Sequence, residues 1–124
     1  MNRVTHFEIY TEHPEKVQPF YRDVFNWNFQ KFEGGPIEYW VVTTGNEDDP
    51  GINGGLTRPR PGQSPGTMNT VAVSSLEESI RKIEKSGGKI CVPKMAIPKV
   101  GWLAYAEDPD GNVFGIIQPD TNAK

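Results

Sequence analysis

Alternating apolar and polar positions in the first half of the chain predict one strand, one helix and then three more strands. Residues 4–10, VTHFEIY, alternate in the manner of a half-buried strand. Pro14 suits the first turn of a helix, where a missing N–H costs nothing. The apolar side chains that follow recur three and four positions apart and share one helical face: Val17, Phe20, Tyr21 and Val24. Three further strands are predicted at residues 26–32, 37–43 and 52–57, the first two separated by Gly34, Gly35 and Pro36.

The second half of the chain repeats this order of elements. Residues 67–73 alternate like a strand, and Ser75 with Glu78 three positions later predicts a capping box at the start of a helix. Three strands follow at residues 89–96, 101–106 and 112–118. The turn between the last two is DPDGN, residues 108–112, in which proline presets φ and Gly111 accepts a positive φ. The chain therefore reads as β-α-β-β-β twice.

One domain made of two modules is the organisation that this repeat predicts. Residues 58–66, RPRPGQSPG, block regular structure and read as a linker between a first module of about residues 1–57 and a second of about 67–124. Each module would cover one face of its sheet with a helix. The opposite faces must then be buried or line something, which curling the two sheets around a shared cleft achieves. We expect an α+β fold with the helices outside.

Composition and charge exclude several classes of protein. The 124 residues are 35% hydrophobic and 23% charged, as in an ordinary folded domain. A net charge of −3 without a basic stripe gives no support for a nucleic-acid partner. We expect no membrane association, since no apolar run approaches the roughly 18 to 20 residues that span a bilayer. The N-terminus lacks the pattern of a secretory signal, and the single cysteine, Cys91, suits a cytoplasmic protein.

Two stretches of the sequence resemble the vicinal oxygen chelate superfamily, which includes glyoxalase I, fosfomycin- and bleomycin-resistance proteins and extradiol dioxygenases. HFEIYTEHPEKVQPFYRDVFNW (residues 6–27) is similar to its opening strand and helix, and GWLAYAEDPDGNVFGIIQPD (residues 101–120) to its closing hairpin. A combination of four short motifs is most similar to a branch usually described only as glyoxalase-related: FEI (residues 7–9), FY (20–21), FNW (25–27) and GGL (54–56). The resemblance implies two βαβββ modules that form a cupped, partly open mixed β-barrel, and a homodimer.

The resemblance also implies a divalent metal in the cup, held by His or Glu residues from the first and last strands of each module. His6 matches the first of these positions. The other three match Met68, Gly115 and, within residues 53–55, most plausibly Gly54. A thioether and two glycines cannot hold Zn²⁺, Mn²⁺ or Mg²⁺ alongside one imidazole. We therefore expect no metal and no other cofactor, unless a rearranged site exists.

Polar and aromatic side chains on the predicted strands are the candidates for a ligand pocket between the modules. These residues are His6, Glu8, Tyr10, Tyr39, Met68, Trp102 and Gly115. His6 and Glu8 are the candidate catalytic residues, since they lie two positions apart on one strand and share a face. If that face is the cup, they form its polar floor; if the register is reversed, Glu8 is solvated. Cys91, in the apolar context KICVP, is expected to be buried.

Three functions are compatible with these residues. The first is a protein that binds a small molecule in the cup without a metal. The second is a metal-dependent lyase or isomerase related to lactoylglutathione lyase, with a rearranged site that uses His6, Glu8 and a carboxylate such as Glu38 or Glu107. The third is drug sequestration, as in bleomycin-resistance proteins, which are also small and acidic.

Metal analysis tests the first of these functions. We expect the purified protein, after incubation with Zn²⁺, Mn²⁺, Ni²⁺ or Fe²⁺ and dialysis, to retain no stoichiometric metal, because a single imidazole does not provide the three or four ligands required. Stoichiometric retention that His6→Ala abolishes would contradict this expectation.

Overall fold

The order of helices and strands is β-α-β-β-β followed by β-α-β-β-β, as the hydrophobic pattern predicts. The computed structural model describes residues 1–33 and 37–124, so Gly34, Gly35 and Pro36, predicted to separate two strands, lie outside the described residues. The chain divides into two compact units, one of His6–Met68 and one of Met1–Thr5 with Asn69–Lys124. Each unit contains a helix and a mixed sheet, which confirms the α+β class and the two βαβββ modules.

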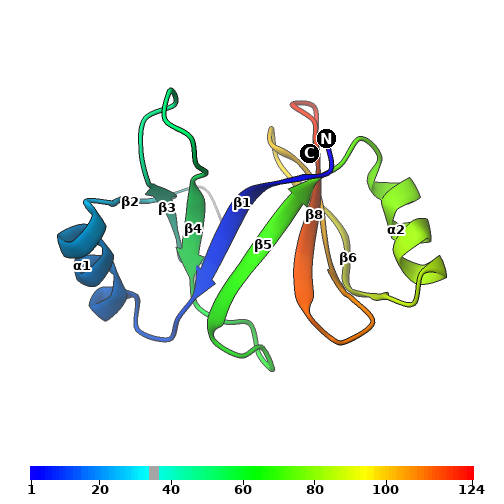
Figure 1. The fold of residues 1–124 in the computed structure, drawn as a ribbon, viewed down its shortest axis with the longest axis horizontal. Coiled ribbons are helices and arrows are strands. Elements are labelled where there is room, and N and C mark those ends of the chain that lie inside the picture. The colour runs from blue at the N-terminus through cyan, green and yellow to red at the C-terminus, as the bar shows by residue number, and fades with distance from the viewer. Residues whose placement is uncertain (34–36) are drawn as a thin grey trace. The chain divides into compact units, whose positions relative to one another are not determined.

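The first unit is built around one face of a four-stranded sheet. Its elements are β1 (Arg3–Tyr10, of which His6 onward belongs to this unit), α1 (Pro14–Phe25), β2 (Asn28–Lys31), β3 (Tyr39–Thr43) and β4 (Gly54–Thr57). The strands are ordered β2-β3-β4-β1; β4 runs parallel to β1, and the other pairs are antiparallel. Figure 1 shows α1 alongside β2 and β3.

The core of the first unit lies between α1 and this sheet. Ile9, Val42 and Leu56 are buried there, and Val17 and Tyr21 of α1 pack against them. These positions agree with the hydrophobic pattern of the sequence. Alternate residues of the strands and residues three or four apart in the helix meet on one side of the sheet. The opposite face of β1 is therefore left to polar residues.

The second unit has the same plan. It contains β5 (Gly66–Ala72, of which Asn69 onward belongs to this unit), α2 (Leu76–Lys85), β6 (Lys89–Ile97), β7 (Gly101–Glu107) and β8 (Val113–Pro119). The strand order is β5-β8-β7-β6, with β5 parallel to β8 and the other pairs antiparallel. Figure 1 shows α2 beside β6. The buried side chains under α2 are Val73, Leu76, Ala104 and Ile116.

Local hydrogen bonds explain where several of these elements begin and end. The Asp108 carboxylate accepts from the backbone N–H groups of Asp110 and Asn112, each at 2.9 Å, and closes the β7–β8 turn in which Gly111 has φ +88°. Asn26 ends α1 in a left-handed conformation, and its N–H donates to Arg22. Because Asn26 is a helix cap, the strand predicted at residues 26–32 shortens to Asn28–Lys31.

Cys91 is exposed, so the expectation that it is buried was wrong. Burial alternates along the first four residues of its strand, β6: Ile90 and Val92 are half-buried, and Lys89 and Cys91 are exposed. The apolar residues around Cys91 therefore take the covered face, and the thiol lies on the other, 3.2 Å from the Glu107 carboxylate. None of the helices in the described residues is both long enough and apolar enough to span a bilayer.

Half of the predicted capping box is present at the start of α2. The Ser75 hydroxyl accepts from the Glu78 N–H at 3.2 Å, whereas the Glu78 carboxylate lies 3.5 Å from the Lys82 ammonium group. We expect Ser75→Ala to lower the free energy of unfolding by about 1 kcal/mol, because one N–H of the first turn loses its acceptor. Urea denaturation measures the loss. Ser74→Ala, at the exposed neighbouring serine, is the matched control, and equal losses in the two variants would refute the cap's contribution.

Candidate functional site: a buried carboxylate held by two tyrosines

The alternation of β1 places its polar side chains on the sheet face opposite α1. Phe7 and Ile9 belong to the core under α1, so His6, Glu8 and Tyr10 point to the other side. Only 9% of Glu8 and 3% of Tyr10 is exposed. Of the two registers considered from the sequence, the solvated one does not hold, because Glu8 is buried.

Two tyrosine hydroxyls hold the Glu8 carboxylate. Tyr10 donates to one carboxylate oxygen at 2.5 Å, and Tyr39, on β3, donates to the other at 2.9 Å. A buried carboxylate is costly unless hydrogen bonds replace its hydration, and bonds to a charged group are stronger than neutral ones. The two phenols supply this replacement from the strand of Glu8 itself and from a strand about thirty residues away.

Gly55 makes the approach of Tyr39 possible. The register of β1 and β4 pairs Gly55 with Glu8, so that both lie on the same face. A Cβ at Gly55 would stand against the Tyr39 hydroxyl, which fills the space that any other residue would occupy. Gly54, the position expected from the sequence to match a metal ligand, instead faces the core, where a Cβ would meet the Phe7 ring at 2.7 Å. The position on the face of Glu8 is therefore Gly55, a correction of one residue.

His6 continues this hydrogen-bonded cluster toward solvent. Its Nε2 lies 3.2 Å from the Tyr39 oxygen and 3.9 Å from Glu8 Oε2, and 38% of its side chain is exposed. Because the Tyr39 proton is donated to Glu8, the Tyr39 oxygen accepts from His6 Nε2–H. The lone pair of the neutral ring then lies on Nδ1. The three residues form a directed chain from His6 through Tyr39 to Glu8.

Burial makes His6 a weaker base than a solvated histidine. Desolvation of the charged imidazolium lowers the pKa of His6 below its usual 6.5, and the nearby Glu8 carboxylate opposes this with a smaller effect that raises the pKa. His6 is therefore mainly neutral at pH 7. In this state Nε2–H can donate to Tyr39 while Nδ1 accepts.

The residues on this face do not fit the divalent metal that the superfamily's enzymes hold. Both oxygens of Glu8 already accept from tyrosine hydroxyls, and Gly55 offers no donor atom. Within residues 1–33 and 37–124, no three His, Cys, Asp or Glu side chains are grouped closely enough to hold a metal ion. Glu38, one carboxylate considered for a rearranged site, lies 3.1 Å from Arg58 instead.

The second unit places an aromatic residue beside its own glycine. Gly115 pairs with Thr70 and Tyr105, and a Cβ there would meet the Thr70 hydroxyl at 2.8 Å and the Tyr105 ring at 3.2 Å. Trp102, expected to line a pocket with Gly115, packs on the opposite face against the core under α2. Its indole N–H donates to Asp120 at 3.0 Å. Tyr105 is thus the aromatic residue that shares the face of Gly115.

The structure brings together four of the predicted pocket residues: His6, Glu8, Tyr10 and Tyr39. Met68 is buried in the same unit. Sequence analysis missed Gly55, although one signal could have found it. Leu56 follows Gly55 and is apolar, and strand alternation therefore assigns Gly55 to the face opposite the core.

Titration of His6 tests the electrostatics of the cluster. We expect NMR to give His6 a pKa below 6.5, and Glu8→Gln to lower this pKa further by removing the charge that raises it. A folded-state pKa below the unfolded value means that the unfolded chain binds the proton more readily. The contribution of His6 to stability is therefore fully present above about pH 6.5 and decreases as the pH falls through the interval down to the lowered pKa. A His6 pKa above 6.5 in the wild-type protein would contradict this account.

Comparisons with known proteins agree with the fold described above. The family model of the Glyoxalase/Bleomycin resistance protein/Dioxygenase superfamily matches residues 3–116. The proteins named "Putative glyoxylase CFP32" from Mycobacterium bovis and Mycobacterium tuberculosis are 26% identical over 113 residues, which is 90% of this chain. The aligned region makes up 42% of those relatives, so the chain spans less than half of their length.

Solved structures of epimerases share the fold at low sequence identity. Methylmalonyl-CoA epimerase from Mycobacterium tuberculosis superposes with a TM-score of 0.69 and 13% identity, covering 94% of this chain and 87% of that one. A Streptomyces coelicolor methylmalonyl-CoA epimerase variant in complex with 2-nitronate-propionyl-CoA gives a TM-score of 0.70 and 12% identity, covering 100% and 99%. The family model, the order of elements and these superpositions agree, and the chain belongs to the Glyoxalase/Bleomycin resistance protein/Dioxygenase superfamily.

Proposed function

We propose that this protein binds a small organic molecule on the sheet face that carries His6, Glu8, Tyr10 and Tyr39, and that it does so without a divalent metal. One observation carries the proposal: Tyr10 and Tyr39 each donate a hydroxyl hydrogen bond to a different oxygen of the buried Glu8 carboxylate. Polar groups that are buried and oriented in this way are typical of ligand sites.

The hydrogen-bond directions favour one class of ligand. His6 Nδ1 carries a lone pair, and Glu8 is a carboxylate close behind it. Both features favour a group that donates a hydrogen bond, such as a ligand N–H or O–H, and the charge of Glu8 disfavours an anion at this position. A neutral or cationic donor is therefore the ligand group that this face suits.

An acid–base enzyme of the lyase or isomerase class is the second candidate. The chain from His6 through Tyr39 to Glu8 favours it, because a neutral imidazole that takes a proton at Nδ1 becomes a cation, and the nearby Glu8 charge stabilises that cation. The fold neighbours include epimerases, but at 12–13% identity that likeness extends to the fold alone.

Fragment binding measured by NMR tests the proposal. We expect neutral and cationic fragments with N–H or O–H donors to shift the signals of His6 and its neighbours. Tyr39→Phe should weaken the binding of these fragments about tenfold, because the variant loses the hydroxyl that orients both His6 and Glu8. Tyr105→Phe, on the sheet of the other unit, is the matched control. Fragments that bind elsewhere, or equally well to Tyr39→Phe, would refute the site.

Deuterium exchange separates binding from catalysis. A bound fragment with a hydrogen on the carbon next to a carbonyl group is incubated in D₂O. If the site is a binding site only, the protein does not accelerate exchange of that hydrogen. Acceleration that His6→Ala removes would establish the acid–base enzyme instead.

A further inference from the structure

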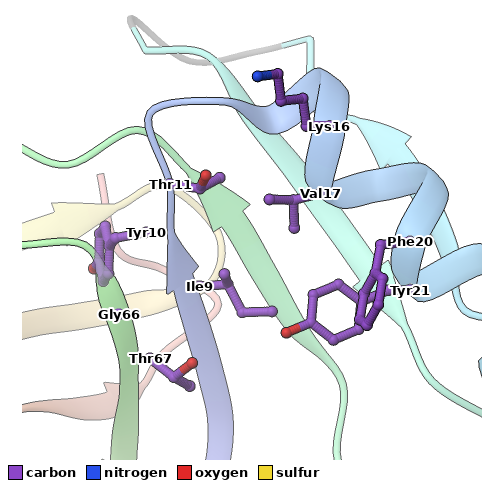
Figure 2. A pocket seen from close by; sticks show the side chains of 9 residues that line it. All are labelled: Ile9, Tyr10, Thr11, Lys16, Val17, Phe20, Tyr21, Gly66 and Thr67. Atoms are coloured by element: carbon purple, nitrogen blue, oxygen red, sulfur yellow. The ribbon is translucent and has the colours of Figure 1, made fainter.

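A hollow lies in the first unit, beside the middle of α1 and the end of β1. Its volume is about 480 Å³, within the range of small-molecule sites. Figure 2 shows Ile9 between the β1 backbone and α1, with Val17, Phe20 and Tyr21 facing it from the helix. The lining residues are Ile9, Tyr10, Thr11, Lys16, Val17, Phe20, Tyr21, Gly66 and Thr67.

The wall that α1 contributes is apolar and partly open to water. Phe20 is 57% exposed, although it contacts Tyr21 edge to face with ring centroids 5.2 Å apart. The hydrophobic stripe of α1 is thus only partly used by the core, where Val17 and Tyr21 pack. A ligand body seated between Ile9, Val17 and Phe20 would cover apolar surface that water now contacts.

Two polar groups of the hollow have no partner among the described residues. The Lys16 ammonium group, like those of Lys85, Lys99 and Lys124, has no carboxylate within 4.0 Å there, whereas the other four lysines each have one. Glu15, next to Lys16 in the chain, lies against His13 and Arg58 instead. The Tyr21 hydroxyl points toward Ile9 in Figure 2 and makes no hydrogen bond within the described part of the chain.

We propose that this hollow binds a small organic anion with an aromatic or branched apolar body. The body would lie against Ile9, Val17 and Phe20, and its carboxylate would meet Lys16 at the rim. The site shares Tyr10 with the face of Glu8 but is otherwise distinct from it, because Ile9 points to α1 whereas Glu8 points to the opposite side of β1. It also has the opposite preference for charge, since Lys16 favours anions and Glu8 disfavours them. The proposal does not depend on the function assigned to the Glu8 cluster.

Three ligands of similar shape but different charge test this proposal: the anion 2-naphthylacetate, the neutral 2-naphthylethanol and the cation 2-naphthylethylammonium. Titration calorimetry and backbone NMR are expected to show 2-naphthylacetate bound at a ratio of one to one, with shifts at Ile9, Val17 and Phe20. The alcohol should bind several-fold more weakly and the ammonium ligand more weakly still, because neither pairs with Lys16. Equal affinity for all three ligands, or no binding of 2-naphthylacetate, would overturn the proposal.

Variants locate the two parts of the site. Lys16→Gln should weaken the binding of 2-naphthylacetate about threefold to fivefold, which is the range of a partly exposed ion pair. The affinity for 2-naphthylethanol should be unchanged. Phe20→Ala should weaken the binding of both ligands, because both lose contact with the aromatic ring. Lys82→Gln, which removes the same charge from an exposed position on α2, is the control. An unchanged affinity of Lys16→Gln for 2-naphthylacetate, or shifts at His6 and Glu8 in place of those at α1, would place the ligand elsewhere.

Discussion

Burial of the Glu8 carboxylate is the constraint on which the polar face of the first unit depends. A carboxylate removed from water requires hydrogen-bond donors at both oxygens, and here Tyr10 and Tyr39 provide them. Tyr39 can reach Glu8 only because Gly55 has no side chain. The same tyrosine oxygen positions His6, so one glycine determines how three polar residues are arranged.

This arrangement also bears on how members of one superfamily can differ in chemistry. The resemblance to metal-dependent relatives implies ligands at strand positions where this chain has glycine, and in each unit an aromatic side chain fills the space beside that glycine. Tyr39 does so at Gly55, and Tyr105 with Thr70 at Gly115. A carboxylate at Gly55 would need Tyr39 to move, and one at Gly115 would need Thr70 to shift. The space that a ligand side chain would need beside these glycines is thus occupied by neighbouring side chains.

The two faces of β1 have opposite chemical character. One face presents a carboxylate, two phenols and an imidazole whose pKa is lowered by burial. The other presents Ile9 to the apolar side of α1, with Lys16 and Tyr21 as the polar groups of the hollow. Tyr10 takes part in both, since its hydroxyl binds Glu8 and its side chain lines the hollow. Apart from Tyr10, at the end of β1, this division follows strand alternation, because adjacent residues of one strand point to opposite sides.

The sequence by itself determined the features that depend on neighbours in the chain. Strand and helix periods established the order of elements, Ser75 marked the start of α2, and DPDGN specified the β7–β8 turn. Tertiary structure decided what depends on contacts across many residues. Tyr39 is 31 residues from Glu8 and 33 from His6, and only the pairing of β3 with β4 and of β4 with β1 brings the three together. A periodic pattern shows which face a residue takes but not the register of the neighbouring strand, and register determines which side chains meet.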